Sequence, residues 1–432
     1  MTRVLVAACL VAAWSRPALA LTLFTEAKRG DFSPTSAVVR VGADRALQAL
    51  RPPTCPTTSS LKFALSQHGN DFEDHGEIPL PCEAWSAVTD GFHYAGGDDR
   101  AGGIREILYT HRGLEIRAEG TGYTPIKGPV AYVEAWLTIG DERHLVRLQN
   151  FRRNAADRIV SRRPSRVAAR GEQAFWDTLW ADQPRSDEAL RLLRHAVRID
   201  PRDGRSQFLL GMLHLYRTSE ACAEFDFHHM CAAGKAEGRA AQRPLDRAVA
   251  LLPYDSRVPG FRAATSYANG FLRHDDARLA RGVQQLEAAI DANPLFNSFD
   301  AFAVAAPILP GTDPYYQGRI LPLVDMVFMS AYCVGTLPEI CNNLGMAPHN
   351  LEGTTLLLGD IDAKGGQLAK AKRWYSLGSI LGANSNYRYE SYLDDRVAHA
   401  AERVAAYQDG DPTNDPPLIG GGGGSCIYCH NK

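Results

Sequence analysis

The stretch "EALRLLRHAVRIDP", residues 188–201, contains a spacing that decides how most of this chain folds. A small residue, a leucine, a second small residue and a proline follow one another at steps of four, three and five, and the same steps recur twice. The three sets are Ala189, Leu193, Ala196 and Pro201; Ala241, Leu245, Ala248 and Pro253; and Gly282, Leu286, Ala289 and Pro294. Steps of three and four put these side chains on one helix face, where small residues let a second helix approach and leucine fills the core. The proline then ends the helix.

Matching small residues occur in segments that can form the partner helices. These are Leu210-Gly211 in "FLLGMLHLY", Gly270 in "SYANGFLR", and Leu358-Gly359 followed by Ala371 and Tyr375 in "LLLGDIDAKGGQLAKAKRWY". On these residues, 172–407 resembles the tetratricopeptide-repeat family, which implies a stack of helix pairs with a groove for a peptide or a partner protein. The pattern prolines lie 52 and 41 residues apart, against the family's period of about 34, and Ala383 stands where a proline is expected. The chain therefore departs from the family by insertions, and the motif identifies no ligand.

Residues 21–155 have the pattern of short strands. "VAYVEAWLTIGDERHLVRLQNF", residues 130–151, predicts a hairpin whose turn is built on Gly140-Asp141, and residues 103–120 carry two strands around Arg112-Gly113. Short β-branched and aromatic runs between Gly, Pro and Asp clusters favour an antiparallel sheet or a small sandwich. We therefore expect a multidomain chain, in which a β-rich domain is joined by a connector at 156–171 to an all-α repeat domain.

The first twenty residues, "MTRVLVAACLVAAWSRPALA", predict a cleaved secretory signal. Arg3 precedes a short apolar run, and Ala18-Leu19-Ala20 has the A-x-A form of a cleavage site. A lipoprotein acylated at Cys9 is the alternative, but few apolar residues precede that cysteine. The signal predicts that the protein is periplasmic or secreted, and no later stretch has the length of an apolar membrane helix.

The charge balance argues against two classes of partner. Lys and Arg number 47, Asp and Glu number 49, and the net charge is −2. We therefore expect neither nucleic acid nor an anionic membrane surface as a partner.

Six cysteines fall into three local pairs: Cys55 with Cys82, Cys222 with Cys231, and Cys333 with Cys341. In an oxidising compartment such pairs favour disulfides that close short loops. Six cysteines allow fifteen connectivities, so the spacing alone leaves other pairings open.

The remaining pair belongs to Cys426-Ile427-Tyr428-Cys429-His430. This resembles the haem-attachment motif of c-type cytochromes, in which two thiols bond to the haem vinyl groups and the adjacent histidine is the proximal iron ligand. The resemblance implies one covalent haem c, attached at Cys426 and Cys429 with His430 on the iron. A redox-active disulfide, half of a zinc site, an ordinary disulfide and a cloning remnant are the alternatives.

The haem motif follows a predicted linker at 408–425. "QDGDPTNDPP" and five glycines favour a chain without stable structure, and residues 426–432 form the tail that carries the motif. Seventeen residues separate Gln408 from Cys426, so the tail reaches roughly 20–25 Å. No cytochrome domain surrounds the motif, so its resemblance places no distal ligand.

The insertion "CAEFDFHHMC", residues 222–231, offers His228, His229 and Met230 between two cysteines. A copper or zinc site is conceivable, and one of these three residues could be the distal ligand of the tail haem. A helical loop closed by a disulfide, with solvated histidines, is the simpler interpretation.

Three functional hypotheses remain. The first is an exported monohaem protein that binds a partner on its helical repeats and uses a tethered haem for electron transfer. The second is a binding or assembly scaffold of the cell envelope, whose terminal cysteines form a disulfide or a metal site. The third, an enzyme, finds little support, because His349, Asn350 and Glu352 have no nucleophile motif beside them.

Overall fold

The structure, a computed structural model, folds into two compact units. The first unit comprises residues 1–65, 73–128 and 133–163, and the second comprises residues 66–72, 129–132 and 164–432. The structure describes residues 20–23, 28–42, 47, 52–53, 55–67, 73–96, 103–119, 125–140, 142–180, 185–222, 227, 230–331, 351–385, 387, 389–409, 411 and 415–418.

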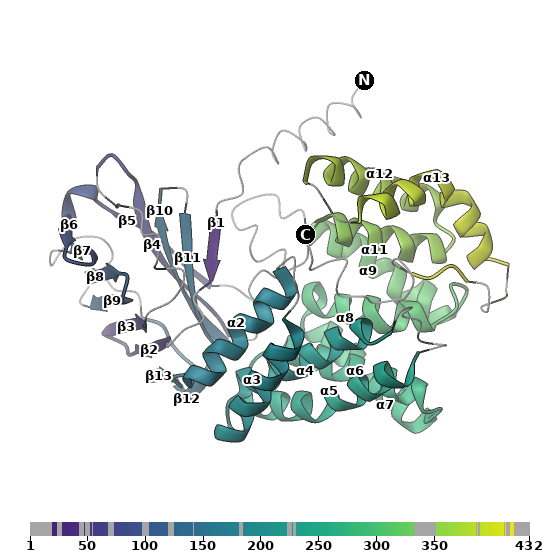
Figure 1. Cartoon of the computed structure of the whole chain (residues 1–432), viewed down its shortest axis with the longest axis horizontal. Helices are drawn as coiled ribbons and strands as arrows, with labels where there is room; N and C mark the ends of the chain where they lie inside the picture. Colours follow the sequence, from purple (N-terminus) through teal and green to yellow (C-terminus); the bar gives the residue numbers. More distant parts are fainter. Residues whose placement is uncertain are drawn as a thin grey trace. The chain divides into compact units, whose positions relative to one another are not determined.

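The first unit is built from strands (Figure 1). They are β1 (Ala20–Leu23), β2 (Arg29–Phe32), β3 (Ser36–Val41), β4 (Ser59–Ser66), β5 (Glu73–Leu80), β6 (Trp85–Val88), β7 (Gly91–Ala95), β8 (Ile104–Thr110), β9 (Gly113–Glu119), β10 (Tyr132–Ile139), β11 (Glu142–Leu148), β12 (Phe151–Ala155) and β13 (Arg158–Ser161). One sheet has the order β1-β11-β10-β4-β5, and the other has the order β12-β13-β2-β3-β9-β8-β7-β6. Strand β1 pairs with β11 in parallel, whereas consecutive strands such as β8 and β9 pair antiparallel.

The predicted hairpin is confirmed as β10 and β11, whose residues Ile139 and Glu142 face each other across the turn. Gly140 turns the chain there with φ of +60°, a conformation that glycine adopts without steric cost. The two strands predicted around Arg112-Gly113 are β8 and β9.

The two sheets pack on each other through large side chains from both. The rings of Phe32 in β2 and Phe63 in β4 pack edge to face, with their centroids 6.4 Å apart. The indole N–H of Trp85 donates to Ser59 Oγ at 3.0 Å. Cys55 and Cys82 form a disulfide with their Cα atoms 5.0 Å apart. The first unit is therefore two-sheeted, with a core between the sheets, which is the sandwich form of the predicted β-rich domain.

The second unit is helical. Its α-helices are α2 (Arg166–Trp180), α3 (Ser186–Ile199), α4 (Gly204–Glu220), α5 (Ala232–Leu251), α6 (Val258–Leu272), α7 (Asp276–Ala292), α8 (Pro294–Ile308), α9 (Leu321–Ala331), α11 (Leu351–Lys364), α12 (Leu368–Ser385) and α13 (Glu390–Tyr407). The order of a β domain followed by a helical domain is thus as predicted.

The spacing in the sequence sets both the ends of these helices and their contacts. Helices α3, α5 and α7 each end two residues before the pattern proline. A Cβ atom on Gly211 of α4 would lie 2.5 Å from Leu245 of α5, and one on Gly282 of α7 would lie 2.7 Å from the backbone of Tyr267 in α6. Glycine is required at these two positions because the paired helices approach this closely.

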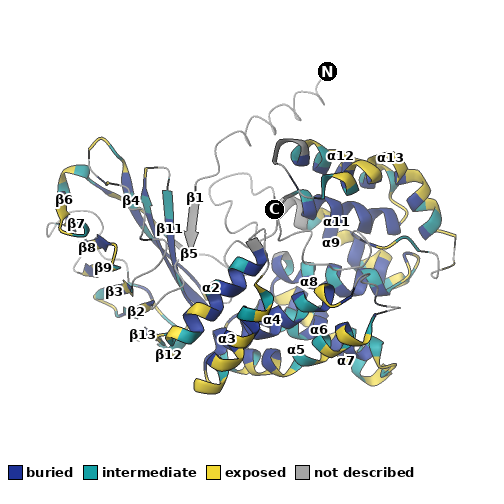
Figure 2. Cartoon of the chain, in the orientation of Figure 1, coloured by how far each residue is buried: buried dark blue, intermediate teal, exposed yellow. Residues whose placement is uncertain are grey.

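The helices differ in how much of their surface is buried (Figure 2). Helix α4 is buried around nearly its whole circumference, whereas α7 buries only the face with Gly282, Leu286, Ala289 and Ile290. Alternation of a central helix with a one-faced helix is expected for stacked pairs. None of the helices that the structure describes is long and apolar enough to cross a membrane.

Two predicted boundaries need correction. The connector predicted at 156–171 is shorter, because β13 extends to Ser161 and α2 begins at Arg166. The predicted linker, 408–425, is not without stable structure throughout, because residues 415–418 within it pack against the helices, as described below.

Candidate functional site

The predicted haem-binding residues Cys426, Cys429 and His430 lie outside the described residues, as do His228 and His229. So do Cys333, Cys341, His349 and Asn350, whereas Glu352 lies in the first turn of α11. The predicted signal also lies outside them, apart from Ala20 at the start of β1. The site is therefore built from the described residues that precede the haem motif.

Cys222 and Cys231 form a disulfide with their Cα atoms 5.8 Å apart. Cys231 also caps α5, since its sulfur accepts from Gly234 N at 3.3 Å. Metal ions bind thiolates, so this disulfide removes two ligands of the copper or zinc site considered above. Met230 is only 4% exposed and packs in the helical core, which leaves its thioether without access to a haem at the surface.

One other group of possible metal ligands occurs among the described residues. Within the part of the chain that the structure describes, the group of His, Cys and carboxylate side chains close enough to share an ion is Cys55, Cys82 and Glu83. Its two sulfur atoms are bonded to each other, so it offers one carboxylate and no thiolate.

Residues 415–418, which we call the C-terminal clasp, are fixed to α11 and α13. Tyr407 donates its hydroxyl to Pro416 O at 2.6 Å, and Arg403 Nη2 donates to Pro417 O at 3.0 Å. Lys364 Nζ lies 3.4 Å from a carboxylate oxygen of Asp415. The next residue, Leu418, is 3% exposed and belongs to the helical core. The clasp therefore anchors the chain before the glycine run begins.

A buried polar network lies beneath the clasp. Asp360, which is fully buried, accepts from Tyr375 Oη at 2.7 Å, from Arg396 Nε at 3.2 Å and from Arg403 Nη2 at 3.3 Å. Burial lowers the pKa of Arg403, but attraction to Asp360, together with the effects of Tyr407 and Tyr375, outweighs burial, so the pKa is raised. A buried guanidinium with its carboxylate partner is rigidly oriented, so Arg403 presents a fixed donor to Pro417.

The clasp shortens the tether that the sequence predicted. Seven residues, 419–425, lie between Leu418 and Cys426. A flexible chain of this length has an end-to-end distance of about 16 Å, and it spans no more than about 28 Å when fully extended. The length of the tether limits a group bonded to Cys426 to about 28 Å from Leu418.

His399 is a surface histidine of α13, four residues before Arg403, at a kink where its backbone has φ of −112° and ψ of 19°. Its Nδ1 lies 2.9 Å from Asp395 Oδ1 and 3.1 Å from Asp395 O, and its side chain is 51% exposed. Both neighbours of Nδ1 are acceptors, so in the neutral ring Nδ1 carries the proton and Nε2 has the lone pair. Metal-binding histidines are typically held this way by a carboxylate or carbonyl.

Sequence reasoning missed His399. The signal that could have found it is an aspartate four residues before a histidine on a helix, in "DDRVAHAAER" at 394–403. That spacing puts both side chains on one face.

Among the described residues of the first unit, His93, His111 and His144 have separate partners and do not form one site. His93 Nε2 lies 3.1 Å from Glu106, and His111 Nδ1 lies 2.7 Å from Leu47 O. His144 Nε2 lies 3.1 Å from the hydroxyl of Tyr109, and burial lowers the pKa of His144 to about 4. Because Tyr109 belongs to the other sheet, this neutral pair joins the sheets.

No known protein family, curated protein or solved structure matches the chain. Its function must therefore be inferred from its own residues.

Proposed function

We propose that the protein is an exported monohaem c-type protein, with haem c attached to Cys426 and Cys429 and with His430 as the proximal iron ligand. The observation that carries this proposal is the Cys426-Ile427-Tyr428-Cys429-His430 motif, whose spacing suits thioether attachment. Two disulfides are typical of oxidising compartments. They support export to the periplasm or beyond, where haem attachment to such motifs takes place.

The clasp supports a haem that stays beside the helical unit. It holds residues 415–418 on α11 and α13, and the remaining tether is short. His399 then becomes the best candidate for the sixth iron ligand, because it is exposed, holds Nδ1 on Asp395 and lies on the same helix as the clasp's donors, Arg403 and Tyr407. His228 and His229 remain alternatives from the sequence, whereas the burial of Met230 argues against that residue.

The role of the helical unit in this proposal is to bind a partner. The helix pairs α4 with α5 and α6 with α7 meet at the small residues on which the resemblance to tetratricopeptide repeats rests. Such stacks bind peptides or proteins in a groove, so we propose a redox partner or a docking protein as the occupant. Electron transfer between that partner and the tethered haem is the proposed activity.

A second candidate function is a haem-free assembly scaffold, in which the terminal cysteines form a disulfide or hold a metal. The helix pairs support this candidate as well as the first. Intact mass and visible absorption of the exported protein, prepared from cells with haem-attachment machinery, separate the two. A c-type protein gains the mass of one haem and a Soret band, and both are lost when Cys426 and Cys429 are replaced by serine.

A further inference from the structure

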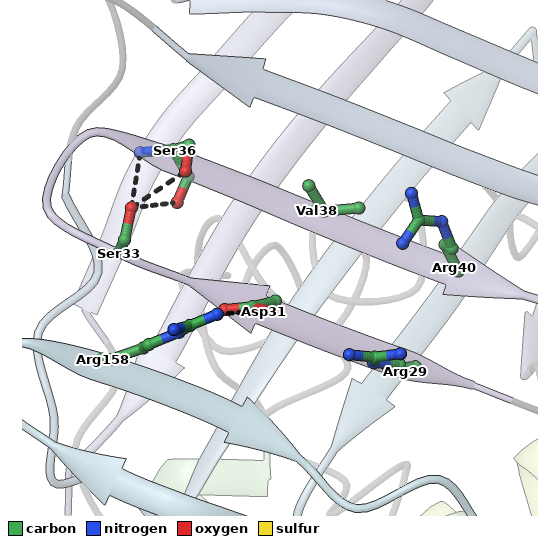
Figure 3. Close-up of a pocket in the computed structure, with 7 residues that line it drawn as sticks. All are labelled: Arg29, Asp31, Ser33, Ser36, Val38, Arg40 and Arg158. Atoms are coloured by element: carbon green, nitrogen blue, oxygen red, sulfur yellow. Dashed lines mark hydrogen bonds and ion pairs between the residues drawn. The ribbon is translucent and has the colours of Figure 1, made fainter.

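The outward face of the eight-stranded sheet carries a hollow lined by arginines, which we call the arginine trough. It consists of two adjoining hollows of about 340 and 350 Å³ that share Arg29 and Arg40. Arg158 lines the first hollow, and Arg112 and Arg163 line the second. Figure 3 shows the first hollow, with Asp31 and Arg158 paired and with Arg29 and Arg40 on neighbouring strands. All five arginines are exposed.

The trough is positively charged although the whole chain has a net charge of −2. Two carboxylates, Asp31 and Glu115, line it beside the five arginines, and Arg112 also pairs with Asp90 outside it at 2.9 Å, which still leaves more cations than anions. The hydrogen bond from Arg158 lowers the pKa of Asp31, and that from Arg40 lowers the pKa of Glu115, so both carboxylates are ionised and paired. Among the described residues, neither Arg29 nor Arg163 has a carboxylate within ion-pair distance. Their guanidinium groups are therefore available to an external anion.

The strand register gives the length of the trough. Val160 of β13 faces Asp31 of β2, which faces Val38 of β3, so Arg158 lies level with Ser36. At the other end, Val41 of β3 faces Leu114 of β9, so Arg112 lies about two residues beyond Val41. These levels are about seven residues apart, or about 23 Å at the rise of a strand. A single small anion is much shorter, whereas seven residues of extended peptide match this length.

Apolar side chains also line the trough. Val38 lies between Ser36 and Arg40 on β3 (Figure 3), and Leu108 of β8 is 37% exposed. The strand register places four residues side by side on neighbouring strands: Leu108, Glu115, Arg40 and Arg29. Apolar surface beside cations fits a peptide that carries both carboxylates and aliphatic side chains, and a sulfated sugar chain has no aliphatic side chains to place there.

We propose that the arginine trough binds an extended acidic segment of a partner protein, about seven residues long, through guanidinium–carboxylate pairs. Long arginine side chains also reach the aliphatic parts of such a segment. This inference concerns the first unit and does not depend on the haem.

The test is fluorescence anisotropy of the full-length protein with a labelled peptide in which Glu and Val alternate over seven residues. The peptide should bind at low salt and weaken as salt screens the charges. Replacing Arg29 and Arg163 together by glutamine should raise the dissociation constant at least about tenfold. The matched control Arg191→Gln, at an exposed arginine of α3, should leave it unchanged.

A variant that binds the peptide more tightly than the wild type cannot owe its effect to misfolding. Glu115→Gln removes a negative charge from the trough, so this variant should bind the acidic peptide several-fold more tightly. Equal affinity of the arginine variants and the wild type would overturn the proposal, and so would equal binding of a Lys–Val peptide. Heparin or inorganic phosphate binding that depends on the same arginines, without peptide binding, would overturn it in favour of a different ligand.

Discussion

His144 and His399 have the same side chain, but their surroundings give them opposite properties. His144 is 2% exposed and lies against Tyr109 between two sheets, whereas His399 is half exposed and held by Asp395 on a helix. Burial disfavours the charged imidazole, so His144 serves stability. Exposure with an oriented ring makes His399 available as a ligand.

His144 should make the first unit sensitive to acid. Its folded-state pKa of about 4 lies below the ordinary value of 6.5, so the unfolded chain takes up a proton first as the pH falls. The stabilisation is therefore complete above about pH 6.5 and is lost progressively towards pH 4, by up to roughly 3 kcal/mol. Urea unfolding at pH 7 and pH 4.5 should show a pH dependence about 2–3 kcal/mol smaller for His144→Gln than for the wild type. A pH dependence in His144→Gln equal to that of the wild type would show that this histidine does not cause the acid sensitivity.

His399 should set the sixth coordination position of the haem. His399→Ala should keep the covalent haem but shift its visible spectrum towards a high-spin or water-bound form, and it should bind added imidazole more readily. His195→Ala, at an exposed histidine of α3, is the matched control. A low-spin spectrum that His399→Ala leaves intact would exclude this residue as the ligand.

The distance between paired helices decides how one added methyl group changes the free energy of unfolding. A Cβ atom on Gly282 would lie 2.7 Å from the backbone of Tyr267, but one on Gly238 of α5 would meet nothing nearer than 4.0 Å. Gly282→Ala must push α7 away from α6 and should lower the free energy of unfolding by about 1–3 kcal/mol. Gly238→Ala should raise it by up to about 1 kcal/mol, because alanine favours the helix. Thermal unfolding of both variants checks the opposite signs, and a stabilising Gly282→Ala would show that the pair is packed differently.

The same elements show what sequence patterns can predict. The small-residue spacing predicted where α3, α5 and α7 lie and end, because helix packing and proline geometry are local rules. The strand alternation predicted the β10–β11 hairpin but not the two-sheet order, since β1 and β11 pair across more than a hundred residues. The disulfides Cys55–Cys82 and Cys222–Cys231 were also accessible to sequence reasoning. The spacing of Asp395 and His399 was visible in the sequence too, but it does not show that this helix face is exposed.

In the whole molecule, the clasp makes residues 415–418 part of the packed helical unit. Prolines and glycines predicted an unstructured linker that begins at Gln408. The structure instead buries Leu418 and uses the carbonyl groups of Pro416 and Pro417 as acceptors for buried donors. Composition could not predict this, because the acceptors are backbone atoms and their donors come from α13.

A pair of truncations tests the clasp. Ending the chain at Gln408 removes Leu418 and the partner of Lys364, and it should lower the free energy of unfolding of the helical unit by about 1–3 kcal/mol. Ending it at Leu418 keeps the clasp and should leave stability close to that of the full chain. Equal unfolding midpoints for the two truncated proteins would show that the clasp contributes nothing.

Intact mass together with the visible spectrum tests whether a haem is covalently attached to Cys426 and Cys429. The protein exported from cells with haem-attachment machinery should be red, should gain the mass of one haem, and should keep its pigment through acid-acetone extraction. Replacing Cys426 and Cys429 by serine should remove the colour while the helical circular-dichroism signal persists. A colourless protein of unmodified mass from the same cells would show that no haem is attached and that the proposed function is wrong.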